Sequence, residues 1–204
     1  MYAIVEDNNI TQYINYPKSV VIGDVRYPAK IFQLWSQAEL NAIGIYEVIT
    51  DSTNYKDPAY YNNTNEQYNF ANGQVTKSWG TATAKRLNDE NAVDEDGNNL
   101  LDDDGNQVIN YGLKTEKKKI VKQQASGLLA PTDWYVVKST EVADYDVPAN
   151  ILSFRADVRT KSNEMETMID NCTTVDELKA LYEYTEQEDG TITRPLPEFP
   201  KEVI

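Results

Sequence analysis

The residues best suited to chemistry in this sequence are the carboxylates of a short internal repeat. Residues 94–101, DEDGNNLL, match residues 102–109, DDDGNQVI, at an offset of eight. Asp and Asn oxygens are ligands that Ca²⁺ prefers, and a Gly between them allows the sharp turn of a calcium-binding loop. The composition of the repeat therefore makes calcium binding one hypothesis for its function.

The repeat does not complete an EF-hand, which requires Gly at the sixth position of the loop and Glu at the twelfth. Counted from Asp94, these positions hold Asn99 and Gly105, and the count from Asp102 also fails at both positions. Asp-Gly pairs are strong turn formers as well. We therefore interpret residues 93–109 as two turns in a solvated acidic ribbon, with calcium binding as the alternative.

Histidine is absent, and Cys172 is the single cysteine of the 204 residues. This composition excludes Ser-His and Cys-His nucleophile pairs, His-ligated zinc and Cys-cluster metal sites. It also excludes an internal disulfide, so Cys172 is expected to be a buried free thiol. Paired carboxylates can hydrolyse glycosides without His, but among 33 acidic residues a sequence pair carries no information. Because no P-loop, G-x-S-x-G or G-x-G-x-x-G motif occurs, we expect no enzymatic activity, no cofactor and no metal.

The net charge is −14, from 33 acidic and 19 basic residues. Because the phosphate groups of nucleic acids and of anionic membranes repel a chain of this charge, we expect neither nucleic acid nor membrane as a partner. A basic run at residues 114–122 is the local exception, which we interpret as a solvated helix face or one docked on an acidic neighbour. The N-terminus lacks the features of a secretory signal, and no apolar stretch approaches the roughly 20 residues that span a bilayer.

The elements that position these groups differ between the two halves of the chain. Residues 1–88 are expected to form a small domain of hairpins and a helix. Ser36 and Glu39 have the spacing of a capping box, which begins a helix, and Asn72-Gly73 is a strong hairpin signal. Short strands are expected at residues 2–5, 10–13, 46–49, 67–70 and 74–82.

A stretch without clear periodicity, residues 50–66, interrupts this domain. It is rich in Asn, Tyr, Asp and Thr. Loops of this length often make contacts, so Tyr60 and Tyr61 are candidate interface residues. The acidic ribbon and linker then follow at residues 89–113.

Residues 114–187 are expected to be helical. A basic helix ends before Pro131, a short helix follows, and Pro148 begins a third. Apolar residues from Ile151 to Cys172 recur at spacings of three and four, which predicts a helix packed on its own domain, with self-association as the alternative. Residues 188–204 form an extended Pro-rich tail, in which Leu196 and Phe199 are candidate anchors onto a surface.

Together these elements predict an α+β fold. It consists of a small N-terminal antiparallel β-hairpin and helix domain, an acidic β-ribbon linker and a C-terminal helical segment.

Three segments resemble a widespread set of bacteriophage tail-associated proteins, which includes tail fibre assembly chaperones and small tail accessory proteins. The start, MYAIV before a polar hairpin, is similar to theirs. The Pro-rich end and the short helix before it, at residues 175–182, are similar too. The most specific likeness is the turn at residues 128–134, LLAPTDW, followed by a Pro-started helix with two spaced arginines, Arg155 and Arg159. The resemblance covers about half of the chain and does not include the acidic repeat.

The resemblance implies a non-enzymatic structural protein of the virion tail, synthesised in the host cytoplasm, that binds other phage tail or fibre proteins. Because virion components occupy symmetric positions, we also expect a homo-oligomer. One alternative is a tail fibre assembly chaperone that is absent from the mature virion. A second alternative, from another class, is a host-carbohydrate-binding module.

Trp134 and Tyr135 are the candidate interface residues of the helical part. Thr132 can cap the helix that starts there, and Asp133 complements its positive end. We expect Trp134 to pack back on the Leu128-Leu129 pair as a buried corner, with a partner-binding hot spot as the alternative.

Overall fold

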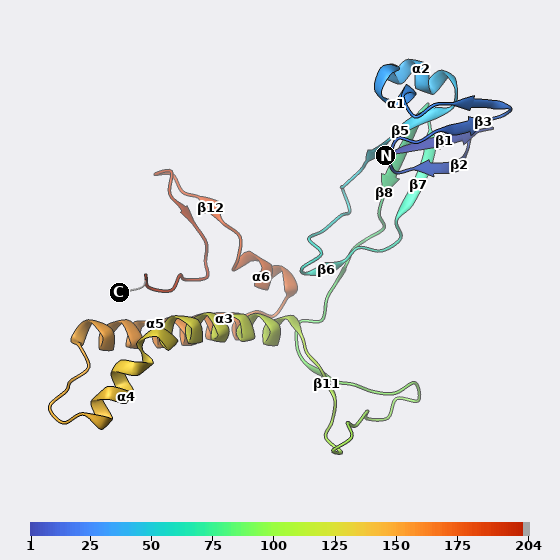
Figure 1. Cartoon of the computed structure of the whole chain (residues 1–204). Helices are drawn as coiled ribbons and strands as arrows, with labels where there is room; N and C mark the ends of the chain where they lie inside the picture. Colours follow the sequence, from blue (N-terminus) through green and yellow to red (C-terminus); the bar gives the residue numbers. More distant parts are fainter. Residues whose placement is uncertain (202–204) are drawn as a thin grey trace. The chain divides into compact units, whose positions relative to one another are not determined.

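The structure is a computed structural model that describes residues 1–201. The chain is mixed α and β, with a curled five-stranded sheet and long helices in its C-terminal half (Figure 1). Its contacts divide it into two compact units, Met1–Ala84 and Lys85–Ile204. The four-part division at residues 88, 113 and 187 stays a prediction.

The first unit is built on a sheet with the strand order β2-β1-β5-β8-β7. All its pairings are antiparallel except that of β5 with β8, which is parallel. The edge strands β2 and β7 approach each other, and the rings of Tyr13 and Tyr68 are 4.7 Å apart. The strands of this sheet are β1 Tyr2–Glu6, β2 Asn9–Ile14, β5 Ile45–Thr50, β7 Gln67–Ala71 and β8 Gln74–Ser78.

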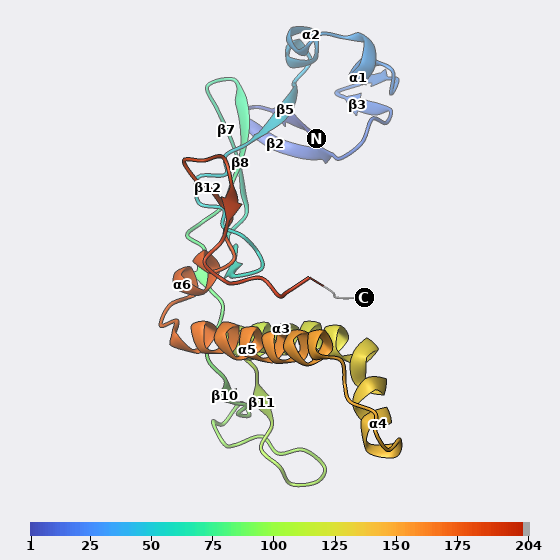
Figure 2. The same cartoon turned by 90° about the vertical axis from the view of Figure 1, so that its left-hand side faces the viewer.

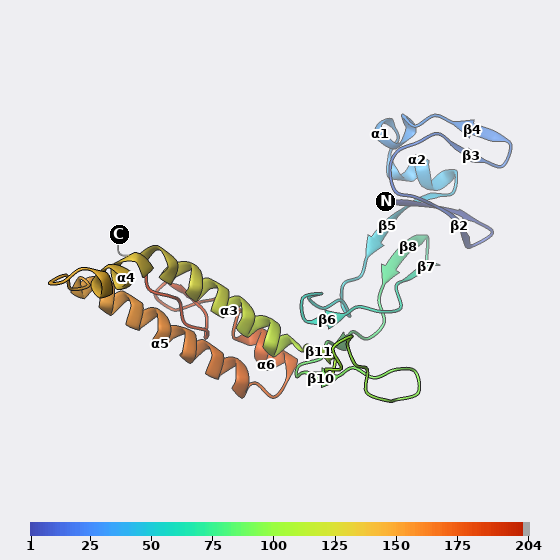
Figure 3. The same cartoon turned by 60° about the horizontal axis from the view of Figure 1, so that its bottom comes forward.

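Two further strand pairs and two short helices complete the first unit (Figure 3). Ser36 accepts the N–H of Glu39, whose carboxylate in turn accepts the N–H of Ser36, so the predicted capping box is confirmed. The predicted Asn-Gly turn is confirmed as well, since Asn72 and Gly73 both have positive φ. The elements are β3 Val20–Ile22, β4 Val25–Tyr27, α1 Ile31–Leu34, α2 Gln37–Ala42, β6 Tyr61–Asn62 and β9 Thr83–Ala84.

Strand β1 is buried on both faces, because side chains alternate along a strand. Ile4 lies in a cluster with residues of α1, α2, β2, β3 and β5. Ala3 and Val5 lie in a second cluster with Val75 of β8. This alternation makes β1 the centre of the first unit.

The second unit is organised around two helices, α3 Leu113–Leu129 and α5 Ala149–Asn171, which lie side by side (Figures 1 and 2). The apolar stripe of α5 faces its own unit, as the favoured interpretation of its periodicity predicts. Five of the stripe residues are buried, namely Ile151, Phe154, Val158, Met165 and Cys172. No helix among residues 1–201 is both long and apolar enough to cross a membrane.

Helix α3 begins directly after Gly112, where a residue 23 positions earlier in the sequence supplies the cap. Asp89 accepts the N–H of Gly112 at 2.8 Å and the hydroxyl of Thr115 at 2.9 Å. A Cβ on Gly112 would lie 2.5 Å from the backbone of Asn88, so only glycine fits this close approach. The start of the linker, at Asp89, is thereby held against the start of α3.

The remaining elements of the second unit are short. Thr174 and Glu177 form the second predicted capping box, which is confirmed, at the start of α6. An unpredicted β-hairpin joins the last residues of the segment expected to be helical to the tail, with its turn at Gly190. The elements are β10 Glu90–Asn91, β11 Ile109–Asn110, η1 Ala130–Thr132, α4 Asp133–Glu141, α6 Val175–Ala180, β12 Thr185–Glu186 and β13 Ile192–Thr193.

We predict that the packing of α5 on α3 depends on Phe154, which is 3% exposed and contacts Ala125 and Val158. Phe154→Ala should destabilise the second unit by about 3–5 kcal/mol, because it removes apolar contacts and leaves a cavity. The measurement is the urea midpoint at which Cys172, the only thiol, becomes reactive.

Leu152→Ala is the matched control, because Leu152 lies on the same helix and is 53% exposed. It should shift the unfolding free energy by less than about 0.5 kcal/mol. Equal effects of the two substitutions would contradict the assignment of Phe154 to the core.

Candidate functional site

The corner between α3 and α4 is held by one buried cation, Arg155 of α5. Its side chain donates to the carbonyl oxygen of Leu129 at 3.1 Å and to the hydroxyl of Thr132, and it pairs with Asp133 at 2.8 Å. Arg155 is 8% exposed, and a charge so buried requires such partners. The residues of the LLAPTDW turn and the arginine that follows it in the sequence therefore meet in space.

Thr132 does not cap α4 as expected. Its hydroxyl donates to the carbonyl oxygen of Leu129 at 2.7 Å and accepts from Arg155. The Thr132 hydroxyl therefore binds Arg155 and Leu129 and not the N–H groups at the start of α4. The prediction that Thr132 caps this helix is wrong.

Helix α4 projects from the end of the α3–α5 pair (Figures 1 and 2), and none of its nine residues is buried. Trp134 and Val137 are each 52% exposed. The expectation that Trp134 is a buried corner is therefore wrong, because Arg155 and not the indole fills that position. We call residues 133–146 the arm.

The aromatic residues of the arm lie close together, with Trp134 exposed and Tyr135 and Tyr145 half-buried. The rings of Trp134 and Tyr135 are 3.9 Å apart. The Lys138 ammonium lies 4.1 Å from the ring of Tyr145 and 5.7 Å from that of Trp134. The candidate interface residues Trp134 and Tyr135 thus form one partly exposed surface with Lys138 and Tyr145, which were not among the candidate interface residues.

The other candidate interface residues lie elsewhere and are more buried. Tyr60 and Tyr61 are each 5% exposed within the first unit. Leu196 is 2% exposed, and its N–H donates to Leu181 at 3.0 Å. Phe199 is half-buried against the cluster of Phe154. Leu196 and Phe199 therefore anchor the tail on its own unit.

The acidic repeat folds around a ring of three backbone hydrogen bonds. The N–H of Ala92 donates to Val108, that of Val108 to Leu100, and that of Leu100 to Ala92, at 2.8–2.9 Å. These three residues are spaced by eight, the period of the repeat. One turn follows Ala92 and the other follows Leu100. Gly97 and Gly105 have positive φ in these turns, so the two predicted turns are confirmed.

The first carboxylate of each repeat is used by its own turn. Asp94 accepts the N–H groups of Asp96 and Asn98 at 3.0 and 2.8 Å, and Asp102 makes the equivalent bonds at the same distances. The backbone bond from Asn98 holds the pKa of Asp94 below its ordinary value. Within residues 1–201, no three acidic or cysteine side chains are grouped to hold a metal ion.

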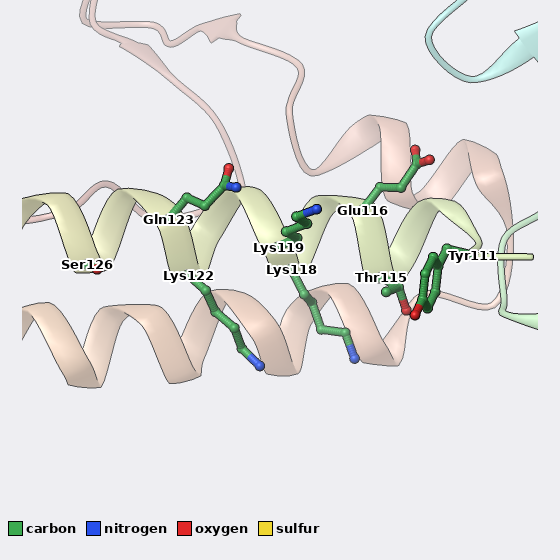
Figure 4. A pocket seen from close by; sticks show the side chains of 8 residues that line it. All are labelled: Tyr111, Thr115, Glu116, Lys118, Lys119, Lys122, Gln123 and Ser126. Atoms are coloured by element: carbon green, nitrogen blue, oxygen red, sulfur yellow. The ribbon is translucent and has the colours of Figure 1, made fainter. Parts of the chain in front are cut away.

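A groove runs along α3, where only a solvated or docked basic face was expected from the sequence. It has a volume of about 740 Å³ and lies on the basic run (Figure 4). Lys118 and Lys122 extend toward α5, where they pair with Asp170 at 2.7 Å and Glu166 at 3.3 Å. The acidic neighbour on which the basic run docks is therefore α5. The lining residues are Tyr111, Thr115, Glu116, Lys118, Lys119, Lys122, Gln123 and Ser126.

We predict that the turns of the repeat persist to a pH below the ordinary pKa of Asp. A lowered pKa in the folded turn means that the ionised carboxylate stabilises the turn. This contribution is complete above the ordinary pKa of Asp and is lost as the pH falls through the lowered pKa. The measurement is the pH titration of the Gly97 and Gly105 amide resonances. Asp94→Asn should change the titration at Gly97 only, and a midpoint at or above the ordinary Asp value would contradict the assignment.

We predict that Arg155→Gln loosens α4 without unfolding α3 and α5. The substitution leaves the Leu129 carbonyl and Asp133 without their cationic donor, at a cost of about 1–3 kcal/mol. The α4 amides should then exchange with deuterium about tenfold faster or more.

Arg159→Gln is the control, since Arg159 donates only to the carbonyl oxygen of Arg155, at 3.4 Å, among the described residues. It should leave the exchange of α4 unchanged within about twofold. Faster exchange in both variants would assign the effect to charge and not to the Arg155 contacts.

No family model matches the chain, and no curated protein or solved structure is significantly similar to it.

Proposed function

We propose that the chain is a non-enzymatic structural protein of a bacteriophage tail. In this proposal it is part of the virion, as a tail fibre, accessory or adaptor component, and it binds other tail or fibre proteins. Its layout is an N-terminal hairpin and helix domain, an acidic β-ribbon linker and a helical segment. The absence of histidine and the single cysteine favour contact over catalysis.

The arm is the observation that carries the proposal. A helix of nine residues is marginal in water by itself, and α4 gains no buried side chain from its own unit. The arm nevertheless exposes an indole and three valines, namely Trp134, Val136, Val137 and Val142. Aromatic and apolar groups gathered on a projecting element are typical of surfaces that bind another protein.

The corner that supports the arm also carries the likeness to phage tail proteins. Leu129, Thr132 and Asp133 belong to the LLAPTDW turn, and Arg155 belongs to the helix that follows. Their mutual contacts favour the interpretation that these four residues act together and hold α4 away from the α3–α5 pair.

Two alternatives remain. A tail fibre assembly chaperone would use the same arm but leave before the virion matures. A host-carbohydrate-binding module would use the adjacent rings of Trp134 and Tyr135, because aromatic faces stack on sugars as well as on side chains.

We predict that mass spectrometry of purified particles of the phage that encodes this chain finds it in a fixed ratio to other tail subunits. Its presence in infected cells and absence from mature particles would support the chaperone instead. Specific signals on a glycan array that Trp134→Ala removes would support the carbohydrate-binding module.

The same particles test the arm. Trp134→Ala with Val137→Ala should lower incorporation at least about tenfold, the equivalent of 1.4 kcal/mol of binding energy. Leu152→Ala is the matched control, as an exposed apolar residue outside the arm, and should leave incorporation unchanged. Normal incorporation of the double variant would contradict the role of the arm.

A further inference from the structure

The second unit carries two segments of opposite charge close together in the sequence. Residues 89–104 contain eight acidic residues and no Lys or Arg. Residues 114–122 contain five Lys and one Glu. This separation is unusual in a chain of net charge −14, and it gives each segment its own electrostatic field.

The basic segment forms part of a longer cationic groove. The hollow on α3 shares Lys122 and Ser126 with a second hollow of about 460 Å³. The second hollow adds Arg155 and Arg159 from α5. The two hollows together present five cationic side chains against two acidic ones, Glu116 and Asp133.

Several of these cations have partners, but the groove is not neutralised. Lys118, Lys122 and Arg155 each pair with one carboxylate. In residues 1–201, Lys119 makes no ion pair, and neither does Arg159. Lys119 and Gln123 also line the groove and point away from α5 (Figure 4).

The acidic ribbon has the complementary chemistry. The second and third carboxylates of each turn, those of Glu95, Asp96, Asp103 and Asp104, are exposed and make no ion pair among the described residues. Between the turns, Leu100 and Leu101 are 45% and 56% exposed. The ribbon can therefore offer both charge and apolar surface to lysine side chains, whose stems are apolar.

We propose that the groove on α3 binds the acidic ribbon of a second copy of this chain. Within one chain, no ion pair among residues 1–201 joins the ribbon to α3. A second copy carries the same net charge as the first, but its ribbon brings negative charge to the groove on two narrow turns, whereas a nucleic acid carries phosphates along its whole length. Such a contact joins two different surfaces, so copies would associate head to tail into a ring or a filament.

This inference does not rest on a role in the phage tail. The chain could be absent from virions and still self-associate, or be a virion component and remain monomeric in solution. Measurements on the purified protein therefore test it separately from the particle experiments.

The experiment uses analytical ultracentrifugation of the full chain at low ionic strength. The wild type should self-associate, and the association should weaken as salt screens the charges. The groove variant Lys119→Glu with Gln123→Glu, and the ribbon variant Glu95→Lys with Asp103→Lys, should each weaken it at least about tenfold. All four substitutions are at exposed positions whose side chains make no described ion pair.

The decisive sample is an equimolar mixture of the two variants. The groove variant retains an intact ribbon and the ribbon variant an intact groove, so the mixture should form a one-to-one complex that neither variant forms alone. A variant with Lys30→Glu and Gln33→Glu in the first unit is the matched control. It changes the net charge by the same amount as the groove variant, at exposed positions, and should associate like the wild type.

Three results would overturn the proposal. They are a wild type that is monomeric at every concentration, self-association that neither variant weakens, and variants that lose association but form no complex when mixed. The neutral variants Lys119→Gln and Glu95→Gln with Asp103→Asn guard against misfolding, since they should give intermediate association. Binding of a single-stranded homopolymer that the groove variant abolishes would assign the groove to nucleic acid instead.

Discussion

The buried guanidinium of Arg155 is the interaction on which the geometry of the second unit depends. It reaches the last residue of α3, the hydroxyl in η1 and the first carboxylate of α4 from a position on α5. A buried charge is stable only where every partner is in place, so these elements can turn in few other ways. The direction of the exposed arm is therefore set by a residue outside it.

The acidic repeat solves a different problem, that of folding a polar segment with almost no core. Only Ala92 is buried in its centre, at 5% exposure. The backbone ring through Ala92, Leu100 and Val108 satisfies one donor and one acceptor of each, and the side-chain amide of Gln107 donates to two of the same carbonyl oxygens at 2.8 Å. Hydrogen bonding and not apolar burial thus gives the ribbon its shape, which leaves its carboxylates on the surface.

Signals confined to a few neighbouring residues could be predicted from the sequence. The two capping boxes, the Asn-Gly turn and the turns of the repeat all follow from local backbone and side-chain chemistry. The apolar stripe of α5 was predictable because its period matches the helix. The exposure of Trp134 was not, since it depends on Arg155, which lies 21 residues later in the chain. The cap that Asp89 supplies to α3 and the groove on that helix likewise depend on pairs of distant residues.

The parallel pairing of β5 with β8 has a consequence for how the chain is made. Strands β1, β2 and β5 pair among themselves, but the second edge of β5 stays open until residue 78 has left the ribosome. An open strand edge is a template for pairing with another chain. Synthesis therefore includes an interval in which the nascent protein exposes Val48, Ile49 and Thr50 as an unpaired edge. Rapid pairing of β8 with β5 is therefore needed during folding, although in the folded sheet this edge is already paired.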